Sequence, residues 1–207
     1  MLKFRASSIA NIMQSGRSKS DLFGKTAQKY LTECFIQHKY GRYKDITSKY
    51  FEKGHEMEED AISMLSVFDK TFYFKNEENF SNEFITGTPD IITDSAVIDI
   101  KCPFDIFTFY DHKSDPLPTV YEYQLLSYGA LTNRSELTLA YTLVNTPESI
   151  FERDSKYKEV NSNLYFYDDI PIEERVYKHT FQFDANKYDE LIERCKLANK
   201  WIEENLK

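Results

Sequence analysis

Cysteine, glycine and proline are all scarce in this chain, which has three, six and six of them among 207 residues. The cysteines, Cys34, Cys102 and Cys195, are odd in number and far apart, which argues against a disulfide framework and a cysteine-rich metal centre. The sequence also lacks an apolar run of membrane-spanning length, a hydrophobic signal segment, an internal repeat and a Pro-rich or Gly/Ser-rich linker. We therefore expect one soluble, cytoplasmic domain with no membrane partner.

Positive charge is also scarce overall, but it is concentrated at the start of the chain. The formal net charge is -8. Residues 1–49 nevertheless hold ten basic and three acidic residues, a local balance of +7, which leaves -15 for residues 50–207. This asymmetry is typical of a protein that contacts a polyanion with one side. A solvated helix surface would explain the same charges without any partner.

Apolar periodicity predicts an α/β domain in which helices flank a mixed central β-sheet. The expected helices span residues 4–13 (begun by a serine cap), 26–41, 47–68 and 119–132, with a last one from an N-cap at Asp184 to about 206. The expected strands span residues 70–75, 82–92, 96–101 and 137–144. Residues 146–180 are interpreted as loops with at most a short edge strand.

The helix over residues 47–68 has an unusual buried stripe. Its expected members are Tyr50, Gly54, Met57, Ala61, Ile62 and Leu65. Glu58 falls inside the stripe, and a buried carboxylate requires a cation or hydrogen-bond donors. A glycine costs a helix about 1 kcal/mol relative to alanine, so Gly54 indicates that another group approaches closely there.

Residues 87–103, GTPDIITDSAVIDIKCP, place charged side chains on a predicted β-hairpin. Side chains alternate along a strand, so Asp99 and Lys101 share one face while the isoleucines between and before them face the core. Pro89 lacks a ladder N–H and belongs at an edge or a bulge, which would turn Asp90 towards Asp99.

Together with Glu58, the hairpin brings three carboxylates towards one ammonium group. A hard divalent ion would balance the surplus negative charge, and oxygen ligands favour Mg²⁺ or Mn²⁺ over Zn²⁺. A plain salt bridge between Asp99 and Lys101, or exposure of both to solvent, would explain the DIK sequence taken alone.

The order of these motifs resembles that of the PD-(D/E)XK nucleases. GTPD followed by DIK is similar to their signature, GHEME to the Gly-x-x-x-Glu motif that precedes it, and QLLSY to the Gln-x-x-x-Tyr motif that follows it. RASSIANIM, DIKCPF and YEYQLLSYGALT further resemble the branch that holds the phage lambda exonuclease, the YqaJ-like viral recombinases and the RecB-type nuclease domains. The resemblance covers about residues 4 to 132.

This resemblance implies a restriction-endonuclease-like catalytic core at about 50–145, preceded by the basic helical region 1–49, within a single nuclease domain 1–207. It implies metal ligation by Asp90, Asp99 and the Ile100 carbonyl, with Glu58 as a further ligand, direct or through water. Lys101 would orient the attacking water or stabilise the charge that develops on phosphorus.

The resemblance also assigns the residues that follow the signature. Gln124 would hold the active-site strand or the scissile phosphate, with Tyr128 packed behind it. A helix side chain that caps a local backbone group is the alternative for Gln124.

A pocket for the 5′-phosphate is a further feature of the family. Ser7 and Thr88 match hydroxyl positions of that pocket, with Ser8 as the alternative, although Ser7 also fits a plain helix N-cap. The family's arginine upstream of this serine has no match here, and Arg5 or Arg17 would replace it.

We therefore expect a Mg²⁺-dependent 5′–3′ exonuclease of double-stranded DNA that acts in phage-type recombination, with Mn²⁺ as a substitute. Its partners would be DNA ends, a single-strand annealing protein and copies of itself in a ring-shaped trimer, in the cytoplasm of a bacterial or phage-infected cell. The alternatives are an endonuclease of the same fold (restriction or junction-resolving) and a non-catalytic DNA-end-binding or inhibitor module.

Overall fold

The computed structural model of the chain describes residues 1–16, 21–44, 48–156 and 159–207. Arg17, one of the two arginines expected at the phosphate pocket, lies outside the described residues. Among the helices of these ranges, none is both long and apolar enough to cross a membrane.

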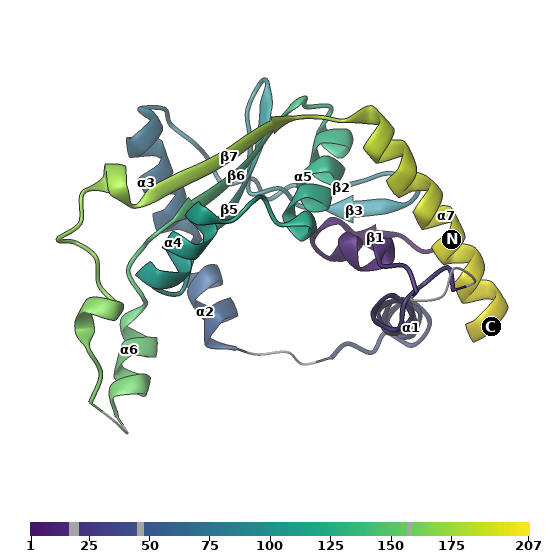
Figure 1. Cartoon of the computed structure of the whole chain (residues 1–207), viewed down its shortest axis with the longest axis horizontal. Helices are drawn as coiled ribbons and strands as arrows, with labels where there is room; N and C mark the ends of the chain where they lie inside the picture. Colours follow the sequence, from purple (N-terminus) through teal and green to yellow (C-terminus); the bar gives the residue numbers. More distant parts are fainter. Residues whose placement is uncertain (17–20, 45–47, 157–158) are drawn as a thin grey trace.

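A four-stranded mixed sheet forms the centre of the molecule (Figure 1). Its strands are, in spatial order, β4 (Ile91–Ile92), β5 (Ala96–Lys101), β6 (Glu136–Thr142) and β7 (Val176–Gln182). β5 and β6 run parallel, whereas β4–β5 and β6–β7 are antiparallel. The expected hairpin is present, with Ile91 opposite Ile98. The predicted α/β class with a mixed sheet is confirmed.

Helices cover both faces of β5. On one face, α3 (Glu58–Asp69) packs its buried Ile62 and Leu65 in one apolar cluster with Ile98 and Ile100. On the other face, α5 (Thr119–Thr132) shares a second cluster with Val97. Asp99 therefore lies on the α5 side, and it faces away from Ile98 and Ile100, as the alternation of the strand predicts.

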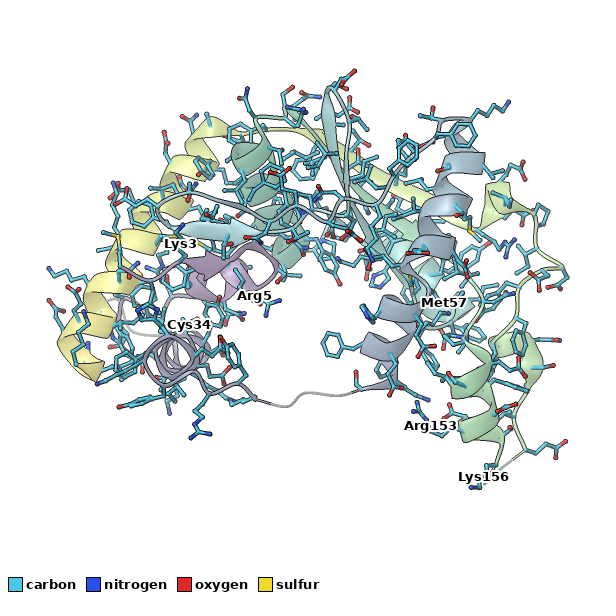
Figure 2. All side chains as sticks on the ribbon, turned by 180° about the vertical axis from the view of Figure 1, so that it is seen from behind. Lys3, Arg5, Cys34, Met57, Arg153 and Lys156 are labelled. Atoms are coloured by element: carbon cyan, nitrogen blue, oxygen red, sulfur yellow. The ribbon has the colours of Figure 1, made fainter. Side chains whose placement is uncertain are left out.

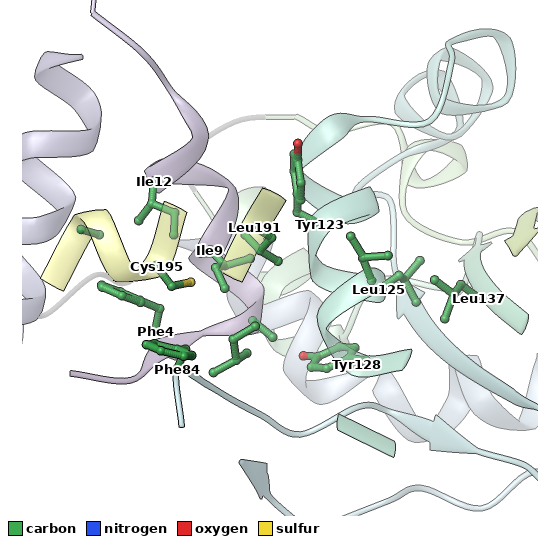
Figure 3. Packing of buried hydrophobic residues seen from close by; sticks show 14 of the residues in the cluster. Phe4, Ile9, Ile12, Phe84, Tyr123, Leu125, Tyr128, Leu137, Leu191 and Cys195 are labelled. Atoms are coloured by element: carbon green, nitrogen blue, oxygen red, sulfur yellow. The ribbon is translucent and has the colours of Figure 1, made fainter. Parts of the chain in front are cut away.

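A small sheet and three helical segments build the N-terminal end of the molecule. β1 (Phe4–Arg5), β3 (Ile85–Gly87) and β2 (Phe80–Ser81) form the sheet. The 3₁₀ helix η1 (Ala6–Met13) packs among α5, α1 (Lys25–Tyr40) and α7 (Ala185–Leu206) (Figure 3). The Leu2 N–H donates to the Asn199 side chain at 2.7 Å, which ties the start of the chain to its last helix.

The helix expected over residues 47–68 is in fact two helices, α2 (Lys49–Glu56) and α3, separated at Met57. The break lets α2 turn a different face inward from the one that the spacing predicts. Lys53 is completely buried, whereas Tyr50, expected in the buried stripe, is 62% exposed. The stripe prediction holds for Ala61, Ile62 and Leu65 of α3.

Other expected elements also differ. The first helix is a 3₁₀ helix without a side-chain cap, because the serines lie inside it. Residues 70–75 form no strand, and residues 82–92 divide between β3 and β4 in different sheets. The region 146–180 holds an unexpected helix, α6 (Glu148–Ser155), the short η2 (Ser162–Leu164) and η3 (Ile172–Glu174), and the full-length edge strand β7. A further helix, α4 (Ile106–Ser114), follows an Asp105 cap.

Candidate active site

A cleft of about 920 Å³ opens between the N-terminal segment and α2, with β5 and α5 between them. The cleft is lined by every described residue of the predicted site: Arg5, Ser7, Glu58, Thr88, Asp90, Asp99, Ile100, Lys101, Gln124 and Tyr128. These residues come from five stretches of the chain (5–7, 58, 88–90, 99–101 and 124–128), so the fold brings together what the motif spacing only suggests. Ser8, the alternative to Ser7, does not line the cleft.

Asp99 is the best-buried acid of the cleft, at 1% exposure. Its Oδ1 accepts a hydrogen bond from Gln124 Nε2 at 2.7 Å. Its Oδ2 lies 2.5 Å from Lys101 Nζ as an ion pair, but no hydrogen-bond donor of the described residues is aligned with it. A buried carboxylate oxygen in this state is a ready ligand for a cation.

Asp90 approaches from the turn before β4, and its Oδ2 accepts the Ile100 N–H at 2.6 Å. Burial, followed by the charge of Asp99, raises the pKa of Asp90 well above its usual range. Burial alone would lower the pKa of Lys101, but Asp99 and Asp90 raise it, so the ammonium stays charged. Asp90 therefore favours its protonated form until a further cation stabilises the negative charge on both carboxylates.

Glu58 lines the same cleft but has its own partner, because its Oε2 lies 3.2 Å from Lys75 Nζ. Within the described ranges, no three carboxylate, imidazole or thiol groups lie close enough to hold a metal ion by themselves. Two carboxylates with an unaligned buried oxygen fit a hard divalent ion that completes its shell with water, as Mg²⁺ does. The sequence analysis missed Lys75, since nothing in its spacing points to Glu58.

Gln124 connects Asp99 to Tyr128. Its Nε2 donates to Asp99 and, at 3.2 Å, to the Tyr128 hydroxyl, so the amide binds two side chains and not a local backbone group. Tyr128 in turn packs on Gly87 of β3, where a Cβ would lie 2.6 Å from the tyrosine Cε1. A glycine is therefore required for β3 to pass this closely.

Hydroxyl and amide groups form the end of the cleft next to η1. Asn79 Nδ2 donates to Thr88 Oγ1 at 3.1 Å, and Thr86 Oγ1 donates to Asn79 Oδ1 at 3.0 Å. Arg5 and Ser7 of the N-terminal segment also line the cleft, and Figure 2 shows where Arg5 lies on this segment. The sequence analysis missed Asn79 and Thr86, which lack a recognisable motif.

The fold and the arrangement of the motif residues are similar to those of solved exonucleases. The structure matches that of a phage-related exonuclease from Haemophilus somnus 129PT with a TM-score of 0.82 and 27% identity, over 98% of this chain and 94% of that one.

An alkaline exonuclease from Laribacter hongkongensis has the same fold, with a TM-score of 0.71 and 17% identity over 97% of this chain and 88% of that one. Its complex with dAMP matches at 0.70 and 18% over the same shares. No family model and no curated protein matches the chain.

Proposed function

We propose that this protein is a metal-dependent deoxyribonuclease, acting as a 5′–3′ exonuclease on double-stranded DNA in phage-type recombination. The observation that carries the proposal is the pairing of Asp99 with Lys101 in a cleft that also holds Asp90 and Gln124. The structural likeness to a phage-related exonuclease at 27% identity supports the same activity class.

Asp90, Asp99 and the Ile100 carbonyl are the proposed ligands of Mg²⁺, for which Mn²⁺ would substitute. When bound, the ion would neutralise charge on the scissile phosphate and make a nearby water more acidic. The hydrogen bond from the Ile100 N–H holds Asp90 in place, and Gln124 does the same for Asp99. Glu58, held by Lys75, would act through water and not as a direct ligand.

Lys101 is the group proposed to act on the reacting atoms. Its ammonium would orient the attacking water or stabilise the charge that develops on phosphorus. Tyr121 supports it from behind, because Lys101 Nζ lies 5.1 Å from the centre of that ring. A charged, positioned ammonium beside the carboxylates suits phosphodiester hydrolysis, in which negative charge develops on the phosphoryl oxygens.

Arg5, Ser7 and Thr88 are proposed to bind the 5′-phosphate, with Tyr128 packed beside them and Asn79 orienting the threonine hydroxyl. Such a pocket would give the enzyme its polarity, since only a strand end with a terminal phosphate would fill it. The Laribacter enzyme has been seen with dAMP, which supports a DNA substrate for this chain. A single-strand annealing partner and a ring-shaped trimer remain predictions.

Linear and closed-circular duplex, incubated with Mg²⁺ and then with a chelator, test the proposal. We expect linear duplex to lose labelled 5′ nucleotides first, the circle to stay intact, and the chelator to stop the reaction. A linearised circle would point to an endonuclease of the same fold. Binding of DNA ends without any cleavage would overturn the enzymatic assignment.

A further inference from the structure

A smaller cavity, of about 360 Å³, lies between the last turns of α1 and α7. Its floor is apolar and consists of the buried side chains of Leu2, Phe35 and Ile202. None of the described residues that line the active-site cleft also lines this cavity. Figure 1 shows α1 and α7 at the opposite end of the molecule from α2 and α6. The cavity is therefore separate from the active site.

The floor of the cavity offers no free hydrogen-bonding side chain among the described residues. Asn199 lines it and is buried, but its amide is already bonded. The Oδ1 atom accepts the Leu2 N–H at 2.7 Å, and the Nδ2 atom donates to the Leu2 and Cys195 carbonyls at 3.1 and 3.2 Å. A polar group that entered this floor would lose its hydrogen bonds to water. The part of a ligand that enters the cavity must therefore be apolar.

The rim of the cavity carries an ammonium group without an acidic partner. Lys39 of α1 has no carboxylate within ion-pair distance among the described residues, and its Nζ lies 5.0 Å from the centre of the Phe35 ring. On α7, Lys207 pairs with Glu203 at 3.0 Å, so the charges of these two rim residues balance each other. A ligand that carries a carboxylate beside its apolar part would therefore pair with Lys39.

The active-site cleft accounts for only a part of the positive charge of residues 1–49. Of the described basic residues in this stretch, only Arg5 lines the cleft. Three others bind partners within the chain: Lys3, Lys44 and Lys49. The remaining cations, Lys39 among them, are available for an anionic ligand that is not the substrate in the cleft.

The aromatic rings beside the cavity are not free to stack on a nucleobase. Phe35 is buried, and its ring meets the Tyr40 ring edge-on with the centres 6.2 Å apart. The Lys39 ammonium lies over both rings. A nucleobase binds a bare ring face, whereas an aliphatic or aromatic side chain of a protein needs only the apolar floor. A protein segment with acidic and apolar residues next to each other fits the cavity better than a nucleic acid.

We propose that this cavity and the Lys39 ammonium, together the α1–α7 pocket, bind an acidic segment of a partner protein. One apolar side chain of the segment fills the floor, and a neighbouring carboxylate pairs with Lys39. This goes beyond the proposed nuclease function, because the pocket attaches the protein to another protein while the cleft stays open to DNA.

A fluorescein-labelled hexapeptide of four aspartates followed by leucine and phenylalanine tests the proposal, in chelator so that DNA cleavage plays no part. Fluorescence anisotropy should show saturable binding to the protein. The peptide with serine in place of leucine and phenylalanine should bind about tenfold more weakly, because nothing apolar then fills the floor. An absence of saturable binding up to about 1 mM hexapeptide would overturn the proposal.

Charge reversal on α1 separates the pocket from a general attraction to the basic N-terminal region. Lys39→Glu should weaken binding about tenfold, because a carboxylate on the rim repels the peptide. Lys25→Glu makes the same change at the other end of the same helix, outside the cavity, and should stay within about twofold of wild type. Both side chains are exposed, so the melting temperature should not change. Equal weakening by the two variants would contradict a specific pocket.

Methyl NMR then locates the bound hexapeptide without any substitution. The Ile202 methyl signals should shift on titration, whereas those of Ile100 in the cleft should not. Shifts at Ile100 alone would place the peptide in the cleft and refute the proposal.

Two further results would assign the α1–α7 pocket to another occupant and so overturn the proposal. One is a single-stranded oligonucleotide of the same net charge that binds more tightly than the hexapeptide and is weakened by Lys39→Glu but not by Lys25→Glu. The other is a lower sedimentation mass of Lys39→Glu than of wild type, since the pocket would then hold a second copy of this chain.

Discussion

Two lysines, one on β5 in the cleft and one buried under α2, have pKa values that are shifted in opposite directions. Lys101 of β5 pairs with Asp99, and the neighbouring acids raise its pKa. Lys53 of α2 is completely buried, and its Nζ donates to the Phe104 carbonyl at 2.9 Å. Burial lowers the pKa of Lys53 to about 8, which the more distant charges of Cys102 and Asp105 only partly offset.

The difference separates a chemical role from a structural one. Burial alone would disfavour the charged form of Lys101, but the neighbouring carboxylates stabilise it. Such a charge is expected where a site must stabilise developing negative charge. Lys53 instead links α2 to the loop directly after β5, between the rings of Phe104 and Tyr167. We therefore expect the chemistry at the strand side of the cleft, whereas Lys53 holds α2 against the rest of the fold.

Asp99→Asn should have the largest effect of these substitutions, because it removes the carboxylate that pairs with Lys101. The amide oxygen still accepts from Gln124, so the local packing is preserved. We expect the cleavage rate to fall by about 10³-fold or more, with DNA binding largely intact. Initial rates on 5′-labelled duplex measure this, and a loss below tenfold would remove Asp99 from the reaction.

Gln124→Leu should have the next largest effect. It removes the donor that orients Asp99, and partners of metal ligands typically contribute about 10- to 100-fold. We expect that loss in kcat at saturating DNA. Tyr128→Phe serves as the control, since it removes only the 3.2 Å contact and leaves the bond to Asp99. Equal losses in both variants would indicate a packing defect.

Lys53→Met should stabilise the protein at pH 7. The lowered pKa of Lys53, from 10.5 to about 8, means that its protonated form destabilises the folded wild-type protein by about 3 kcal/mol. The variant avoids this cost but loses the hydrogen bond to Phe104, which contributes about 1 kcal/mol. In the wild-type protein Lys53 does not destabilise the fold above pH 10.5, where it is neutral in both the folded and the unfolded state. The destabilisation grows as the pH falls and is complete once the pH is below about 8. Urea denaturation should therefore show the gain at pH 7 and little of it at pH 10.5. A gain in stability that did not depend on pH would show that it comes from packing and not from the charge of Lys53.

Arg153→Ala should have the smallest effect. Arg153 of α6 (Figure 2) pairs with Glu52 of α2 at 2.6 Å on the surface, and exposed ion pairs contribute little. We expect activity within about threefold of wild type at low salt, and no difference at high salt, where the pair is screened. Lys196→Ala, which breaks a surface pair on α7, is the matched control. A larger loss would show that α6 positions α2.

The strand, its hairpin with the preceding segment and the shared face of Asp99 and Lys101 could be predicted, because they follow from local alternation and one proline. β5 has the expected bounds, and α5 and α7 begin and end within a residue of their predicted positions. The burial of Lys53 could not be predicted, since it depends on the break at Met57 and on rings from distant segments. The same holds for Lys75, which meets Glu58 only in the folded chain.

The location of the metal ion tests the central claim most directly. A crystal soaked in Mn²⁺ and measured at its absorption edge should show an anomalous peak within coordination distance of Asp90, Asp99 and the Ile100 carbonyl, beside Lys101. The peak should disappear in Asp99→Asn. A peak bound elsewhere, or none at all in crystals of the active protein, would contradict the account.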